Sequence, residues 1–191
     1  MNAIFKAASD LQSFCKGKGW RFCFIGGLAV LRWGEPRQTQ DADLTLMTGF
    51  ANEEHFVDLL LKEFIACEKD ARDFALQRRV LLLKHPNGVP MDVALGAIPF
   101  EENSVERSSL WKCSPDCTLR ICSAEDLIVH KAFAGRPIDW IDIESVLRRQ
   151  EKLDIALIHR ELEPLIEAKE EPEALSRLDR LLVKYRHTWK A

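Results

Sequence analysis

The stretch that most constrains the fold spans residues 24–44 and joins a glycine pair, Gly26-Gly27, to two closely spaced carboxylates, Asp41 and Asp43. An apolar segment leads into the glycines, a short helical pattern follows, and the carboxylates open another apolar run. This order predicts a strand, a glycine turn, a short helix and a second strand. Because side chains alternate faces along a strand, Asp41 and Asp43 are expected to point the same way.

These residue types together indicate phosphate chemistry. Adjacent carboxylates repel each other, and a cation between them relieves the repulsion; Mg²⁺, with Mn²⁺ as the alternative, suits carboxylate oxygens and retains waters for a phosphate. The glycine pair would let a phosphate approach backbone N–H groups where a helix begins. A third acid, Asp92, interrupts another apolar run. Three acids on neighbouring strands can hold two metal ions, so Asp41, Asp43 and Asp92 are the predicted metal-binding and catalytic residues.

Each of these residues also has an ordinary structural interpretation. The two carboxylates could form a turn or a helix cap, and Asp92 could be an exposed strand acid. The glycines could serve only to pack the helix closely on the sheet. An acid within an apolar strand is more easily explained by a cationic partner, which favours the metal site.

Five pieces of the sequence, in this order, resemble the nucleotidyltransferase superfamily typified by DNA polymerase β. They are Gly26-Gly27, Asp41-x-Asp43, Asp92 and the segments 125–132 and 135–142. The run 32–44 resembles one branch, the AbiEii-type toxins and their relatives, and the resemblance covers roughly residues 20 to 150. In one departure, many members have Gly-Ser where this chain has Gly26-Gly27. The departure removes a hydroxyl and leaves the backbone donors.

The resemblance implies a set of nucleotide-binding residues, for which a solvated surface position is the ordinary alternative. Arg37, a planar fork, would reach a β- or γ-phosphate, and Lys131, otherwise a surface lysine, would contact the triphosphate. Of Asp139 and Asp142, the latter is the better candidate to face the site and orient Lys131 or Arg136. The predicted set is Gly26, Gly27, Arg32, Arg37, Thr39, Lys131 and Asp142.

By this resemblance, the chain would transfer a nucleoside monophosphate from ATP, GTP, CTP or UTP to an acceptor hydroxyl, with Asp92 placed to accept the proton. The acceptor stays open between the 3′ end of a tRNA, in a toxin restrained by a cognate antitoxin, and a protein side chain. A small molecule, as in aminoglycoside or lincosamide adenylyltransferases, is the alternative. The net charge of −3 and pI near 6.0 favour a cationic small molecule over RNA, whereas the resemblance favours the toxin. An alternative of another class is a non-catalytic nucleotide-binding or interaction module.

The predicted fold class is α+β. A small mixed sheet flanked by helices would occupy residues 1–122 as the nucleotidyltransferase core, and residues 123–191 would form a helical region packed on it. Without a signal-like start or a long apolar stretch, the chain is expected to be soluble and cytoplasmic, with no membrane partner.

Two weaker patterns also suggest a ligand. Cys113, Cys117, Cys122 and His130 suggest zinc, but their spacing fits no standard pair of ligand turns, and the six cysteines of a cytosolic chain are expected to be reduced. The last helix carries a basic run that is either a solvated face or part of an RNA-binding groove, formed by Arg177, Arg180, Lys184, Arg186, His187 and Lys190.

Overall fold

The computed structural model describes residues 2–185 and divides into two compact units. The first unit comprises Met1–Leu28 and Gln38–Cys122, and the second comprises Ala29–Arg37 and Ser123–Ala191. The segment 29–37 therefore belongs with the helical C-terminal half, although it lies between two strands in sequence. Within the described residues, no helix is both long enough and apolar enough to cross a bilayer.

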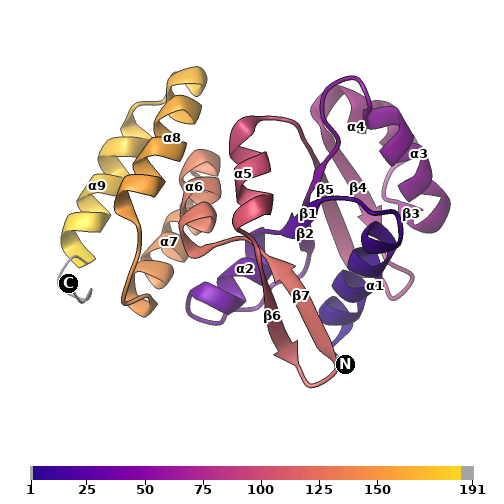
Figure 1. Cartoon of the computed structure of the whole chain (residues 1–191), viewed down its shortest axis with the longest axis horizontal. Helices are drawn as coiled ribbons and strands as arrows, with labels where there is room; N and C mark the ends of the chain where they lie inside the picture. Colours follow the sequence, from indigo (N-terminus) through magenta and orange to yellow (C-terminus); the bar gives the residue numbers. More distant parts are fainter. Residues whose placement is uncertain (1, 186–191) are drawn as a thin grey trace. The chain divides into compact units, whose positions relative to one another are not determined.

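The first unit is built on a mixed seven-stranded sheet with the order β3-β4-β5-β2-β1-β7-β6 (Figure 1). The β2–β5 and β1–β7 pairs are parallel, and the remaining pairs are antiparallel. The strands are β1 (Phe22–Phe24), β2 (Ala42–Met47), β3 (Ile65–Ala66), β4 (Val80–Lys84), β5 (Pro90–Gly96), β6 (Ser109–Ser114) and β7 (Cys117–Ile121).

The central strands are the most apolar. Every residue of β1 is buried, and in β2 and β5 the buried side chains include Leu44, Leu46, Met91 and Val93. Burial on both faces explains why these runs are nearly continuous in apolar residues. The acids at the starts of β2 and β5 are therefore held on a rigid, buried sheet.

Helices complete the first unit. The helix α1 (Ala3–Gly17) packs on β7 and β2, α5 (Pro99–Arg107) packs on β2 and β1, and α3 (Glu53–Glu63) packs on α4 (Ala71–Arg78). The apolar period of α1 buries Ile4, Ala8, Leu11 and Cys15 on one face. The helix α2 (Gly26–Trp33) begins in the first unit and ends in the second.

The second unit consists mainly of the helices that follow β7 in the chain. They are α6 (Ala124–Ala134), α7 (Pro137–Arg149), α8 (Ile155–Lys169) and α9 (Glu173–Tyr185). The Ser123 side chain caps α6 by accepting from the Asp126 N–H, and Gly135, at φ +69°, ends it. Pro137 then starts α7 at a position where its missing N–H costs nothing.

The predicted α+β class with a small mixed sheet is confirmed. Residues 65–79 contain β3 and α4, and the sequence gives little sign of α4 because this helix has almost no apolar periodicity. One detail differs from the prediction. Asp41 was expected inside a strand with Asp43, but β2 begins at Ala42, so only Asp43 lies in the strand.

Candidate active site

Three aspartates of the first unit form the acid cluster: Asp41, Asp43 and Asp92. Asp43 and Asp92 are register partners across the parallel strands β2 and β5, which places both side chains on one face of the sheet. Asp41 immediately precedes β2. One carboxylate oxygen from each residue lies within 4.8 Å of the other two, and all three side chains are half-buried. The predicted meeting of the three acids is therefore observed, although Asp41 reaches it from outside the strand.

Within the acid cluster, the charged form of Asp92 is disfavoured. Burial raises the pKa of this carboxyl above its usual value, and the neighbouring charge of Asp41 raises it further. Charge on Asp92 is thus disfavoured by its surroundings, and a divalent cation would reverse this. The donor set consists of carboxylate oxygens alone, which suits a hard cation such as Mg²⁺ or Mn²⁺ and does not suit a soft one.

The glycine pair packs directly against this cluster. Gly26 has φ +55°, and a Cβ built on it would overlap the Asp43 Oδ2 and lie 2.6 Å from Asp43 Cγ. The Gly27 N–H donates to the same Oδ2 at 3.4 Å. A side chain at position 26 would therefore both strain the backbone and displace a carboxylate. The backbone at the start of α2 therefore lies in contact with the Asp43 carboxylate.

Thr39 lies beside the glycines. A Cβ built on Gly27 would overlap the Thr39 Oγ1, and this hydroxyl donates to Asp41 Oδ1 at 3.2 Å. Of the predicted site residues, the first unit thus gathers Gly26, Gly27, Thr39 and the acid cluster in one place.

In the second unit, five residues form what we call the charge network: Arg37, Lys131, Arg136, Asp139 and Asp142. Arg37 donates from Nε and Nη2 to the two oxygens of Asp142, at 2.7 and 2.8 Å. Lys131 Nζ bridges both acids, 2.8 Å from Asp139 and 2.9 Å from Asp142. Arg136 Nε completes the network on Asp139 at 2.7 Å.

The charge network stabilises its carboxylates in the charged form. Burial acts to raise the pKa of Asp142, but hydrogen bonds from Arg37 and Lys131 outweigh it and the pKa falls below its usual value. The pKa of Asp139 is lowered in the same way, by Arg136 and Lys131 acting against burial. This pattern is that of a satisfied ion-pair cluster.

The charge network changes the interpretation of Lys131. It was expected at the surface by default, yet it is only 5% exposed and paired with two acids, so the surface interpretation is wrong. Asp139 and Asp142 are both buried and both contact Lys131, whereas the sequence favoured Asp142 alone. Arg32 lies over the Trp33 ring at 4.0 Å. The predicted nucleotide contacts of Arg32, Arg37, Lys131 and Asp142 stay predictions.

The zinc interpretation finds no support in residues 2–185. The Cys113 thiol donates to the Cys117 carbonyl, Cys122 is buried, and the acid cluster is the single group of three or more residues there that could hold a metal. In the basic run, Arg177 stacks on Trp140 and Lys184 bonds Glu144. Arg186, His187 and Lys190 lie outside the described residues.

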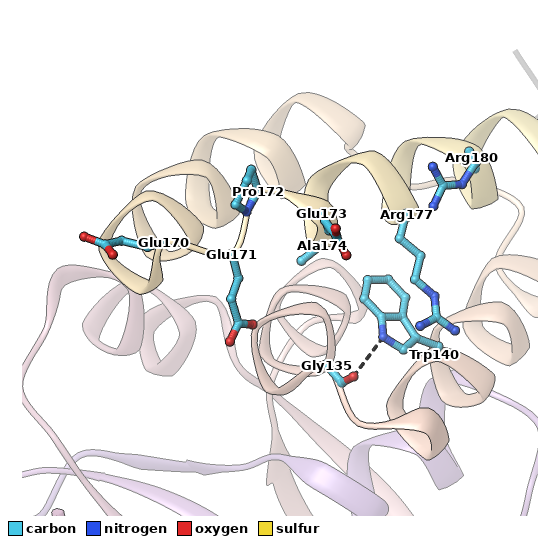
Figure 2. A pocket seen from close by; sticks show the side chains of 9 residues that line it. All are labelled: Gly135, Trp140, Glu170, Glu171, Pro172, Glu173, Ala174, Arg177 and Arg180. Carbon is cyan, nitrogen blue, oxygen red and sulfur yellow. Dashed lines mark hydrogen bonds between the residues drawn. The ribbon is translucent and has the colours of Figure 1, made fainter.

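The second unit also contains a pocket of about 620 Å³. Figure 2 shows the Trp140 side chain, which lines the pocket, with its indole N–H directed to the Gly135 carbonyl and Arg177 against the ring. The indole nitrogen lies 3.0 Å from the Gly135 oxygen. Glutamates around the turn between α8 and α9 line another part of it. None of the predicted site residues lines this pocket, and it gives no support to a nucleotide site.

Comparisons with known proteins agree with this geometry. The family described as nucleotidyl transferase AbiEii toxin, type IV toxin–antitoxin system, matches residues 11–190. Among curated proteins, none matches the sequence significantly. The crystal structure of an antigenic nucleotidyltransferase-like protein from Paracoccidioides brasiliensis is similar at a TM-score of 0.53 and 15% identity, covering 92% of each chain. The lincomycin-bound lincosamide antibiotic adenylyltransferase LnuA is similar at a TM-score of 0.50 and 13% identity, covering 74% of this chain and 94% of the other. At such low sequence identity, the structural similarity shows that the fold is shared and nothing more.

Proposed function

The chain belongs to the AbiEii nucleotidyltransferase toxin family, and on this premise we propose that it transfers a nucleoside monophosphate from a nucleoside triphosphate to an acceptor hydroxyl with the help of Mg²⁺. The acid cluster is the observation that carries the proposal. Three carboxylates from two parallel strands and the adjoining loop place oxygens within 4.8 Å of one another, and one of them, Asp43, lies against the backbone of Gly26-Gly27. Metal-assisted transfer at phosphorus requires such a donor set beside a phosphate cradle.

In this reaction, Asp41, Asp43 and Asp92 would hold the cation. When bound, the ion neutralises phosphate charge and favours in-line displacement. The N–H groups at the start of α2 would orient the triphosphate, since they already approach the Asp43 carboxylate. By resemblance to the family, Asp92 would also accept the proton of the attacking hydroxyl. Positioning and charge neutralisation would supply most of the rate.

For the acceptor, we favour a macromolecular hydroxyl, at the 3′ end of an RNA such as tRNA or on a protein, in a toxin restrained by a cognate antitoxin. Family membership supports this choice. A small-molecule acceptor is the second candidate. It is supported by the fold shared with a lincosamide adenylyltransferase and by a pI near 6.0, which suits a cationic drug better than RNA. A nucleotide-binding module without turnover is the third.

Label transfer tests the proposal. The protein is incubated with Mg²⁺ and each α-labelled nucleoside triphosphate, in the presence of total RNA, cell lysate, or a panel of aminoglycosides and lincosamides. The matched controls are Asp43→Asn and Asp116→Asn, an exposed acid of the same unit. Label on RNA or protein that is lost only in Asp43→Asn would establish the toxin-type reaction, and label on a drug would establish the second candidate. Nucleotide binding without transfer would favour the third, and no binding at all would overturn the proposal.

A further inference from the structure

Two adjoining cavities lie in the first unit, at the ends of β1 and β2 that are opposite to the acid cluster. One has a volume of about 450 Å³ and the other of about 360 Å³, and Gly19, Trp20 and Arg21 line both. Asp43 lies near the start of β2, whereas Met47, which lines the smaller cavity, ends the strand. The rise along the strand between these two residues is roughly 13 Å. The cavities are therefore separate from the proposed reaction centre.

The larger cavity carries positive charge that the protein does not compensate. Lys16, in the last turn of α1, and Arg120, on β7, both line it. Within residues 2–185, neither cation is paired with a carboxylate. Arg120 donates from one guanidinium nitrogen to the carbonyl and the hydroxyl of Ser108, at 3.2 and 3.3 Å, and both acceptors are neutral. These bonds orient the guanidinium and leave its other N–H groups for a ligand.

Arg21, between the two cavities, has counter-charges of its own. It donates to Glu102 at 2.8 Å and to Glu106 at 3.1 Å. Since this pairing neutralises Arg21, the uncompensated charge of the larger cavity is that of Lys16 and Arg120. A guanidinium and an ammonium in one cavity match a compact anion with several acceptor oxygens, which is the chemistry of a phosphate group.

The smaller cavity has an aromatic wall. Trp20 and Phe56 both line it with their ring centroids 4.7 Å apart, and both side chains are partly exposed. Met47 and Ala97 add apolar surface. Partly exposed aromatic rings beside a cationic groove are typical of sites on which nucleic-acid bases stack, because every base has a flat π-face. The two cavities thus offer an aromatic half and a cationic half that share Trp20.

We propose that the two cavities together bind one nucleotide unit, with its base against Trp20 and Phe56 and its phosphate on Lys16 and Arg120. Both volumes fall within the range of small-molecule pockets, about 300–1,000 Å³. The unit is either a free nucleotide or one nucleotide of a single-stranded RNA, since both present the same base and phosphate. The site goes beyond the proposed function, because none of its residues belongs to the acid cluster.

The first test addresses the cationic half. AMP and a short single-stranded RNA are titrated in the presence of a chelator, which removes the metal expected at the acid cluster. Lys16→Gln should weaken both ligands roughly tenfold and should reduce the salt dependence of RNA binding by about one phosphate contact. Lys62→Gln, at an exposed position on α3 that lines neither cavity, is the matched control and should bind as wild type does. Equal binding by Lys16→Gln and wild type would overturn the proposal.

The second test addresses the aromatic half. Trp20→Phe keeps a ring, whereas Trp20→Leu keeps apolar volume without a π-face. Trp20→Leu should weaken AMP binding at least about fivefold, the lower bound for the stacking of one base, and Trp20→Phe should retain most of the affinity. Inorganic phosphate should bind all three proteins equally. If folded Trp20→Leu, checked by circular dichroism, binds AMP as wild type does, no base occupies the cavity and the proposal is wrong.

The same titrations identify the source of the nucleotide. Tighter binding of RNA than of AMP, weakened in Lys16→Gln, would assign the site to an RNA strand, and AMP binding at least as tight would assign it to a free nucleotide. The inference fails separately from the proposed function, because Asp43→Asn should lose nucleotidyl transfer and keep this site. Absence of AMP and RNA binding to wild type under chelation would overturn the inference and leave the outcome of label transfer untouched.

Discussion

The acid cluster of the first unit and the charge network of the second both partly bury aspartates, yet the pKa of Asp92 in the cluster rises whereas the pKa values of Asp139 and Asp142 in the network fall. Burial acts to raise the pKa at Asp92, Asp139 and Asp142 alike. At Asp92 the next influence is another acid, Asp41, and the pKa rises. At the other two residues, arginine and lysine donors reverse the effect of burial, and the pKa falls.

The opposite pKa shifts distinguish buried acids that have cationic partners within the protein from a buried acid whose charged neighbour is another acid. The charge network supplies its own counter-charges, with Lys131 shared between two acids and a bidentate arginine on Asp142. It therefore favours the charged form of its own acids. In the acid cluster the surroundings still disfavour charge on Asp92, so the cluster costs stability until an ion binds. Groups that cost stability and share one location are those expected to have a function.

The largest effect we expect is on catalysis. Asp43→Asn should lower nucleotidyl transfer by roughly a thousandfold, because it removes a charged ligand from the acid cluster and with it about 4 kcal/mol of transition-state stabilisation. Single-turnover transfer of α-labelled nucleotide measures this loss, with Asp116→Asn as the control that keeps full activity. Transfer within about tenfold of wild type in Asp43→Asn would show that the cluster is not the catalytic centre.

The next effect is on stability, in the charge network. Asp139→Asn should lower the free energy of unfolding by about 3 kcal/mol, because it leaves Lys131 and Arg136 with one acid fewer in a buried site. Urea unfolding measures the change. Glu35→Gln, which breaks the exposed pair with Arg148, is the matched control and should cost at most about 1 kcal/mol. A small effect of Asp139→Asn would mean that the network does not stabilise the second unit.

A smaller effect of opposite sign is expected in the acid cluster. Asp92→Asn should stabilise the metal-free protein by roughly 0.5–1 kcal/mol, because it removes a half-buried charge and its repulsion with the neighbouring Asp41. The unfolding midpoint in the presence of a chelator measures the gain. Destabilisation by Asp92→Asn under chelation would indicate that the native contacts favour the charged carboxylate.

The smallest expected effects concern pH. The changes in unfolding free energy caused by Asp92→Asn and by Asp139→Asn should each depend on pH. The folded pKa of Asp92 lies above the ordinary value of 3.8, so the penalty of its charge is present above that folded pKa and disappears as the pH falls to 3.8. The folded pKa of Asp139 lies below 3.8, so its stabilisation is complete above 3.8 and is lost as the pH falls through the folded pKa.

Unfolding midpoints of both variants, followed from neutral pH to about pH 3, check this order. The advantage of Asp92→Asn should shrink at higher pH than the deficit of Asp139→Asn does. The reverse order would contradict the assignment of the two pKa shifts.

The sequence predicted the acid cluster because its signals are local. The glycine pair, the spacing of Asp41 and Asp43, and the acid within an apolar run are each visible in the sequence without knowledge of the fold. The parallel pairing of β2 with β5 then brings Asp92 beside Asp43. The fold class followed from the same alternation of strands and helices. β2 begins at Ala42, one residue later than predicted, so Asp41 lies in the preceding loop.

The charge network could not be predicted in the same way. Lys131 reads as a surface residue in a helical pattern, and its burial depends on how α6, α7 and the segment 29–37 pack together. Arg37 and Asp142 lie 105 residues apart, so their pairing leaves no local signal. Thr39 was predicted as a nucleotide contact by resemblance alone, and only the coordinates show that it fills the space beside Gly27.

The central claim is that the three aspartates repel one another until a divalent cation binds them. The most direct test is the unfolding midpoint of wild type and Asp92→Asn, each with chelator and with saturating Mn²⁺. We expect the order to reverse: Asp92→Asn is the more stable protein without metal, and wild type is the more stable protein with it, because the ion stabilises the intact cluster by mass action. If Mn²⁺ leaves the order unchanged, the acid cluster is not a metal site and the account is wrong.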